Sequence, residues 1–188
     1  LDVMTKDSIL QLIESFIFFE IDKKDPKKKT LIFPRYHQRR AVSRLLEDMR
    51  SNHTESNYLI QHSAGSGKTN TIAWLAHSLV SLHDEENNNI VDTVLIVTDR
   101  IVVDRQLQDA VKQIGHKNGV VKVMGDRETS SDLADAIAGN TKIIATTIHK
   151  FAQINQSDWM TVGNTANKKF AILIDEAHSS TTGSYMSS

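Results

Sequence analysis

The sequence predicts an α/β fold in which helices cover a mainly parallel sheet. From residue 58 onward, short apolar runs alternate with amphipathic stretches, which is the pattern of repeated strand-helix units. A glycine-rich turn at 63–69 joins one apolar run to a helix, and another apolar run at 170–174 ends in two adjacent carboxylates. With 188 residues, the chain has the length of one domain with a short appendage.

Two helices are predicted ahead of the sheet. The first covers 8–19, where apolar residues recur at helical spacing. A charged loop containing Pro26 follows and ends at Pro34, and the second helix covers 36–50. Gln38 falls on the apolar stripe of this second helix, so its amide points inward and needs a polar partner.

Five strands and four further helices make up the rest of the predicted domain. The strands are expected at 58–61, 91–97, 119–124, 142–145 and 170–174. The helices are expected at 69–83, 102–114, 131–138 and 147–154. We expect residues 155–168 to form a surface excursion and Trp74 to be a core residue rather than a platform for base stacking.

Composition excludes several classes of protein. Hydrophobic residues make up 39% and charged residues 24%, which fits neither a disordered chain nor a coiled coil. The absence of cysteine excludes disulfides and thiolate metal sites and favours a reducing, cytoplasmic setting. No apolar run reaches the length of a membrane span, so we expect a soluble protein without a membrane partner. The histidines show no pair at ligand spacing with carboxylate support, so no zinc site is predicted.

Charge is unevenly distributed along the chain. Residues 22–44 contain nine basic and two acidic side chains, a net charge of +7, although the whole chain carries only −1. A run such as Lys27-Lys28-Lys29 is compatible with an ordinary solvated loop or with contacts to a phosphate backbone. The sequence leaves both interpretations open.

A phosphate-binding loop is predicted at 63–69, where the sequence reads Ser63-Ala64-Gly65-Ser66-Gly67-Lys68-Thr69. The small residues Gly65, Ser66 and Gly67 allow backbone N–H groups to approach a phosphate closely, and the helix that follows adds its positive N-terminus. The alternative is a glycine-rich turn between a strand and a helix that carries an incidental lysine.

Two further side chains of this turn fit a nucleotide. Lys68 is expected to bridge the β- and γ-phosphates, and Thr69 is expected to present its hydroxyl to Mg²⁺. The strict P-loop pattern has glycine where this chain has His62, which is a departure from the pattern. The core of the turn nevertheless keeps all the residue types that the pattern needs.

The second chemical feature is the acidic pair Asp175 and Glu176, directly after the apolar run 170–174. Because the carboxyl ends of parallel strands share one edge of a sheet, this pair and Lys68 can meet there. Asp175 suits Mg²⁺ coordination through water, and Glu176 suits orienting or polarising an attacking water. Alone, such a pair is more often a solvated strand end, but in a chain that also has the phosphate loop the nucleotide-site interpretation is favoured.

Together these motifs resemble the first motor domain of a superfamily 2 helicase or translocase, with a RecA-like, three-layer P-loop NTPase fold, over residues 34–180. The resemblance implies that ATP and Mg²⁺ are the cofactors and that Gln38 reads the adenine edge. It also implies nucleic-acid contacts and one coupling residue. The contacts are Arg100, Thr146, Thr147 and Lys150, and the coupling residue is His178. For Thr146, Thr147 and Lys150, a helix cap with solvated neighbours is the alternative.

A narrower resemblance is to the restriction subunit of type I restriction-modification enzymes. It rests on four motifs and on a helix ending in Phe-Ile-Phe-Phe-Glu at 16–20. The motifs are Arg35-Tyr36-His37-Gln38, the stretch 61–76, Asp99-Arg100 with Asp104-Arg105-Gln106-Leu107, and Asp175-Glu176-Ala177-His178-Ser179-Ser180. The resemblance implies a motor that couples ATP hydrolysis to translocation of double-stranded DNA and distant cleavage. Modification and specificity subunits are the implied partners.

This resemblance also sets expectations for domain organisation. Residues 1–33 are expected to be a helical linker from an upstream nuclease domain, and 34–188 the first RecA-like ATPase domain, cut short at its C-terminal end. A second RecA-like domain must supply an arginine for hydrolysis, so we expect this chain alone to bind ATP weakly and to hydrolyse it negligibly. Another superfamily 2 helicase or remodelling translocase, or a nucleotide- or DNA-binding module without turnover, are the alternatives.

Overall fold

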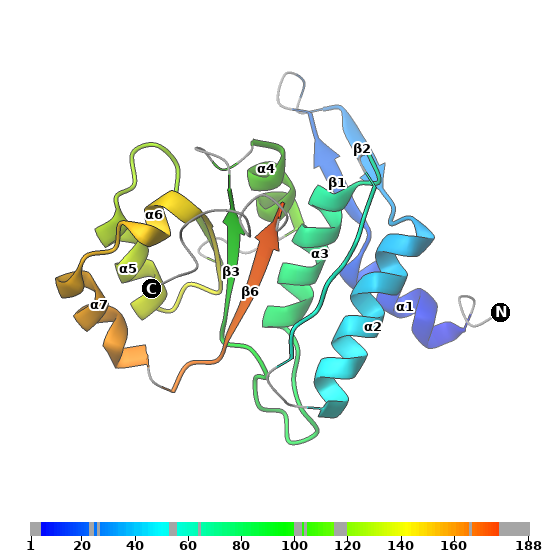
Figure 1. The fold of residues 1–188 in the computed structure, drawn as a ribbon. Coiled ribbons are helices and arrows are strands. Elements are labelled where there is room, and N and C mark those ends of the chain that lie inside the picture. Colours follow the sequence, from blue (N-terminus) through cyan, green and yellow to red (C-terminus); the bar gives the residue numbers. More distant parts are fainter. Residues whose placement is uncertain are drawn as a thin grey trace.

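A central parallel sheet organises the chain. The computed structural model describes residues 5–22, 25, 27–52, 56–63, 65–99, 103, 105–114, 120–165 and 167–176. The sheet has four strands in the order β4-β5-β3-β6, all parallel (Figure 1). Their bounds are β3 Thr93–Thr98, β4 Val121–Val123, β5 Ile143–Thr147 and β6 Phe170–Asp175. The predicted α/β fold with a parallel sheet is confirmed.

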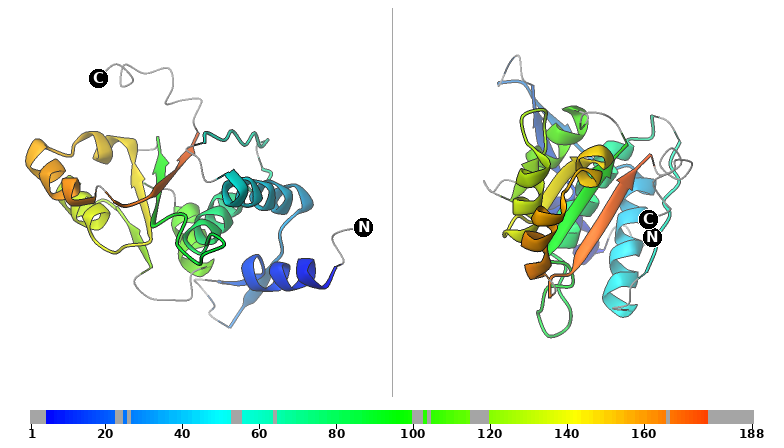
Figure 2. Two further views of the ribbon diagram at one scale, coloured as in Figure 1. Left: turned by 90° about the horizontal axis from the view of Figure 1, so that it is seen from below. Right: turned by 60° about the vertical axis from the view of Figure 1, so that its left-hand side comes forward.

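Helices cover both faces of this sheet, which makes three layers (Figures 1 and 2). One face carries α3 (Lys68–Val80) and α4 (Arg105–Ile114), with α2 (Tyr36–Asn52) packed outside α3. The other face carries α5 (Ser130–Ala138), α6 (Ile148–Ala152), α7 (Gln156–Val162) and the 3₁₀ turn Gly163–Thr165. Alternating residues of β3 divide between the two cores, because successive side chains of a strand point to opposite faces.

The register aligns the carboxyl ends of three strands. Thr98 of β3 pairs with Thr147 of β5 on one side and with Asp175 of β6 on the other. These three positions therefore lie in one row across the sheet, at the edge where polar side chains are predicted. In such sheets, ligands bind outside the carboxyl ends of the strands.

The N-terminal region differs from its prediction. The helix expected at 8–19 is shorter, α1 (Lys6–Ser15), and the chain then forms an antiparallel hairpin of β1 (Phe18–Ile21) and β2 (Lys29–Ile32). The hairpin was not predicted, because the aromatic run was assigned to the helix, although aromatic residues favour strands. Phe16 and Phe18 pack against Trp74, whose ring centroid lies 5.9 and 6.1 Å from theirs. Trp74 is 1% exposed, as expected for a core residue.

The predicted strand at 58–61 is wrong. Residues 56–63 have no strand assignment, and Leu59 is 87% exposed. A strand needs a hydrogen-bonded neighbour. Among the described strands, none pairs with residues 56–63. Instead, the hydroxyl of Tyr58 donates to Asp48 Oδ2 at 2.6 Å and ties the segment to α2.

The other predicted elements are present with shifted ends. Residues 155–168 hold α7 and the 3₁₀ turn, and none of their described side chains is fully buried, as expected for a surface excursion. Val162 of α7 packs into the core that α5 forms on this face, which explains why the segment is helical. No helix in the described part of the chain is long and apolar enough to cross a membrane.

Candidate nucleotide site

Two glycines shape the predicted phosphate loop. Gly65 has φ +72° and Gly67 has φ +85°, and only glycine adopts this left-handed region without strain. Gly67 is the N-cap of α3 and offers no side-chain hydrogen bond to the first turn. The N-terminus of α3 therefore keeps its N–H groups available for an anion, as the sequence predicts. Ala64 lies outside the described residues.

Gln38 finds its polar partners in this loop. Its Nε2 donates to the carbonyl of Gly67 at 2.8 Å, and its Oε1 accepts from the N–H of Arg35 at 2.8 Å. The side chain is 3% exposed. A Cβ at Gly67 would lie only 2.5 Å from Nε2, so any larger residue there would displace the Gln38 amide. The expectation that a buried amide needs a partner is confirmed.

Lys68 meets both carboxylates that follow β6. Its Nζ donates to Glu176 Oε1 at 2.7 Å and lies 3.4 Å from Asp175 Oδ1. The side chains of Lys68, Asp175 and Glu176 are 39%, 16% and 31% exposed, so solvent reaches the cluster. The turn ending in Lys68 and the acidic pair thus face each other at one edge of the sheet.

This cluster has a shifted pKa and an unusual backbone conformation. The hydrogen bond that Lys68 donates to Glu176 raises the pKa of the Lys68 ammonium, partial burial opposes the rise, and the charge of Asp175 adds to it. Lys68 is therefore a full cation at neutral pH. Glu176 itself has φ +58°, a left-handed conformation that is uncommon for glutamate and recurs at functional sites.

Asp175 and Thr69 offer oxygen ligands of the kind that Mg²⁺ prefers. Asp175 Oδ1 is buried and accepts no hydrogen bond, although Lys68 lies nearby. A carboxylate oxygen in that state suits a hydrated divalent cation. Thr69 occupies the second position of α3, directly after Lys68. In the described part of the chain, three or more His, Cys, Asp or Glu side chains nowhere gather into a metal site of their own.

Two histidines beside the loop were not predicted to belong to the site. His37 Nε2 lies 3.2 Å from the carbonyl of Ser66, and the ring of His62 meets the ring of His37 edge-on at 5.4 Å. Burial lowers the pKa of His62, and the positive charges of His37 and Lys68 lower it further. The available signals were the replacement of the first loop glycine by His62 and the position of His37 next to Gln38.

The predicted nucleic-acid contacts lie at the same sheet edge but are engaged within the chain. Thr146 is fully buried, and the hydroxyl of Thr147 caps α6 by accepting from the N–H of Lys150 at 3.3 Å. Lys150 Nζ donates to the carbonyls of Gly125 and Glu128. The helix-cap alternative therefore describes Thr147 in this structure. Arg100 and His178, the other expected contact and the coupling residue, lie outside the described residues.

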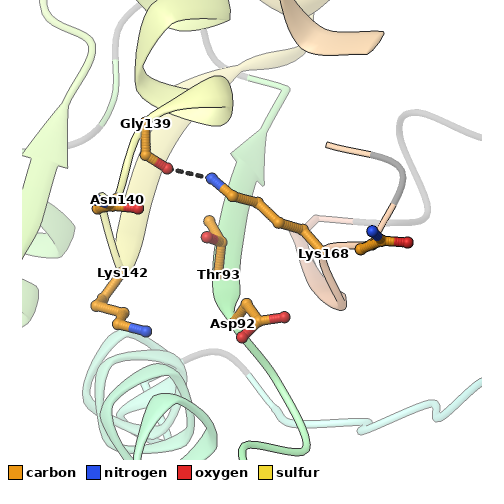
Figure 3. A pocket seen from close by; sticks show the side chains of 7 residues that line it. Asp92, Thr93, Gly139, Asn140, Lys142 and Lys168 are labelled. Carbon is orange, nitrogen blue, oxygen red and sulfur yellow. Dashed lines mark hydrogen bonds between the residues drawn. The ribbon is translucent and has the colours of Figure 1, made fainter. Parts of the chain in front are cut away.

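A polar pocket of about 290 Å³ opens at the opposite edge of the sheet (Figure 3). Its lining residues are Asp92, Thr93, Gly139, Asn140, Lys142, Asn167 and Lys168. Lys168 Nζ donates to carbonyls in the last turn of α5, including that of Ala138 at 2.9 Å. A lysine at a helix C-terminus stabilises the helix dipole. These bonds give Lys168 a structural role, and the pocket lies away from Lys68.

The chain is similar in sequence to known proteins. The curated relatives include a protein of Methanocaldococcus jannaschii described as "Putative type I restriction enzyme MjaVIIIP endonuclease subunit". It is 29% identical over 98% of this chain and 19% of its own length. The MjaVIIP endonuclease subunit of the same organism, described in the same terms, is 31% identical over 61% of this chain and 11% of its own. The chain thus spans at most about a fifth of these relatives.

No solved structure matches significantly. The sequence model of the SWI2/SNF2 ATPase family matches residues 37–188, a range that begins one residue before Gln38 and includes Lys68, Asp175 and Glu176. Since this match covers most of the chain and contains the whole lysine-carboxylate cluster, the chain belongs to the SWI2/SNF2 ATPase family.

Proposed function

We propose that the chain is the ATP-binding motor domain of a protein that translocates double-stranded DNA, and that the parent protein is the restriction subunit of a type I restriction enzyme. One observation carries the ATP-binding part: Lys68 lies within ion-pair distance of both Asp175 and Glu176 beside a loop with two left-handed glycines. A cation, a helix N-terminus and two carboxylates at one sheet edge are the parts that nucleotide hydrolysis needs.

Lys68 has to exchange partners when a nucleotide binds. Its ammonium now neutralises Glu176 and Asp175, and in the bound state it neutralises the outer phosphates. Because Lys68 is more than a third exposed, water screens its present ion pairs, and they offer little resistance to the exchange. The exchange releases Glu176 to orient the attacking water.

Thr69 and Asp175 are the residues that would hold Mg²⁺, with the metal neutralising charge on the phosphates. The buried Oδ1 of Asp175, which lies 3.4 Å from Lys68 Nζ but accepts no hydrogen bond, supports this assignment. Gln38 is proposed to read the adenine edge, held in place by its bonds to Arg35 and Gly67. Both roles are proposals that follow from the position of these residues around the loop.

DNA is proposed to pass along the same sheet edge, with Arg100, Thr146, Thr147 and Lys150 as its contacts. Thr146 and Thr147 are 0% and 1% exposed here, so they would have to become exposed when DNA binds. The register supports the location, since Thr147 and Asp175 flank Thr98 in one row. The described side chain best suited to a phosphate is Lys150, which would have to exchange its two carbonyl acceptors for DNA. His178 is proposed to couple the ATP site to later motifs of the parent.

The restriction assignment is supported by the names of the two Methanocaldococcus jannaschii relatives, one of which aligns with nearly the whole chain. On this proposal the parent also contains a nuclease domain and a second RecA-like domain. It assembles with modification and specificity subunits in the cytoplasm. The relatives are several times longer than this chain, which leaves room for the further domains of this proposal.

The test is DNA-stimulated ATP hydrolysis by the full-length parent and its variants. We expect the wild type to hydrolyse ATP and both Lys68→Ala and Glu176→Gln to lose hydrolysis by about a hundredfold or more. A parent that binds ATP but never hydrolyses it would favour a binding module. A parent that hydrolyses ATP yet neither cleaves DNA nor assembles with modification and specificity subunits would favour another superfamily 2 translocase.

A further inference from the structure

The back of the phosphate loop is held by two consecutive residues of α2. His37 Nε2 lies 3.2 Å from the carbonyl of Ser66, and Gln38 Nε2 donates to the carbonyl of Gly67 at 2.8 Å. A carbonyl oxygen can only accept, so Nε2 of His37 must carry the hydrogen in this contact. The neutral Nε2–H tautomer and the imidazolium both provide that hydrogen.

These contacts control where the loop amides point. A trans peptide is planar, and its C=O and N–H point in opposite directions. Holding the carbonyl of Ser66 against α2 therefore turns the N–H of Gly67 away from α2. The carbonyl of Gly67 accepts from Thr71 in the first turn of α3 as well as from Gln38, so the N–H of Lys68 is oriented by both helices. Gly65 and Gly67 have no side chains to restrict rotation of the backbone. Contacts from α2 can therefore determine how the peptide groups of this loop are oriented.

The ring of His62 packs against the ring of His37. The two rings meet edge-on at 5.4 Å between centroids, a favourable geometry for an aromatic pair. His37 itself is exposed, so without this neighbour its ring would have solvent on most sides. The pair also accounts for the residue that departs from the P-loop pattern, because glycine at position 62 could not make this contact.

We propose that His37, braced by His62, is a positioning residue of the phosphate loop, which sets the direction of the Gly67 N–H and so strengthens binding of the phosphates and not of the base. The proposal rests on the proposed function, since it concerns the same nucleotide site. It assigns roles to His37 and His62 that the resemblance does not imply.

The experiment measures binding of two probes to the 188-residue chain by calorimetry: Mg²⁺-ATP, and inorganic tripolyphosphate with Mg²⁺, which has no base. His37→Phe keeps a ring against His62 but lacks the donor, and we expect it to weaken binding of both probes by the same factor, about fivefold. His37→Gln restores a donor and should bind both probes within about twofold of wild type. His62→Ala should bind both probes with affinities between those of His37→Phe and His37→Gln. His62→Phe should bind both probes as wild type does.

The matched control is His83→Ala, since His83 Nδ1 also contacts a backbone carbonyl, that of Ser81 at 2.9 Å, but outside the loop. It should bind both probes as wild type does. Equal melting temperatures across the set confirm that every variant is folded. Tripolyphosphate affinity unchanged in His37→Phe would overturn the proposal, and so would a loss confined to ATP, which would place His37 at the base.

Failure of the proposed function would give a different binding result from failure of this inference. In that case wild type and Lys68→Ala would bind both probes equally weakly or not at all, which would contradict the nucleotide site and this inference together. Binding that depends on Lys68 but not on His37 would contradict this inference alone.

Discussion

Lys68 and Glu176 are separated by 108 positions in the chain, yet the ammonium of the first donates to a carboxylate oxygen of the second at 2.7 Å. The parallel sheet explains this contact, because β6 ends at the edge where the loop before α3 also lies. Two loops that are distant in sequence thereby form one charged cluster, and the proposed ATP site depends on it.

Removing the charge of Glu176 should strengthen nucleotide binding by this chain. Lys68 would lose its closest partner and would be more available to the phosphates, so we expect Glu176→Gln to bind Mg²⁺-ATP up to about fivefold more tightly. Calorimetric titration measures the effect. Glu20→Gln, an exposed acidic residue of the hairpin, controls for the change in net charge. Weaker binding by Glu176→Gln than by Glu20→Gln would contradict the partner exchange.

The two loop glycines should respond differently to alanine. Gly65→Ala meets no atom within 4 Å, so its cost is the left-handed φ alone, about 1–2 kcal/mol of unfolding free energy. Gly67→Ala has the same backbone cost, and its Cβ also displaces the Gln38 amide, for a total of about 2–3 kcal/mol. Urea unfolding of both variants measures the difference. Equal costs would show that the Gln38 contact contributes nothing.

Much of this site could be predicted from sequence, because its residues lie in short contiguous patterns. Local sequence patterns identify the loop with its glycines and Lys68, and they identify the pair Asp175 and Glu176. The loop and the acidic pair are expected to meet because the carboxyl ends of parallel strands share one edge of a sheet. His37 and His62 could not be predicted in the same way. Their contact joins α2 to the loop, and no local pattern signals a pair of rings 25 residues apart.

The secondary structure, too, could be predicted only in part from the sequence. Segments whose neighbours are helices or inner strands were assigned to the right element, as for β3 and α3. Residues 58–61 have the composition of a strand, yet strand formation depends on a pairing partner that composition does not reveal. The β1–β2 hairpin was missed for a related reason, since helical spacing and strand propensity compete in the run that ends at Phe19.

Stability should fall on acidification in a way that depends on His62. The pKa of His62 is lowered from its ordinary value of 6.5 in the folded chain. The unfolded chain therefore takes up a proton at His62 more readily than the folded chain does. The contribution of neutral His62 to the free energy of unfolding is complete above about pH 6.5 and is lost as the pH falls below that value. Between about pH 7.5 and pH 5, the melting temperature of wild type should drop more than that of His62→Gln. Parallel curves for the two proteins would contradict the shift.

Trp74 should prove central to the contact between the hairpin and the domain. Its ring is buried against Phe16 and Phe18, so Trp74→Ala should cost about 3–5 kcal/mol in urea unfolding. The indole N–H is buried without a hydrogen-bond partner. Trp74→Phe should therefore cost much less, because it keeps an aromatic ring and removes an unsatisfied donor. Similar losses for both variants would point to an unrecognised partner of the indole.

The most direct test of the nucleotide pocket is the affinity of this chain for Mg²⁺-ATP, titrated calorimetrically into wild type, Lys68→Ala and Lys112→Ala. Lys112 is an exposed lysine of α4, so its removal matches the change in charge. We expect Lys68→Ala to bind at least about tenfold more weakly than wild type, and Lys112→Ala to bind within about twofold of it. Equal affinity in wild type and Lys68→Ala would contradict the account.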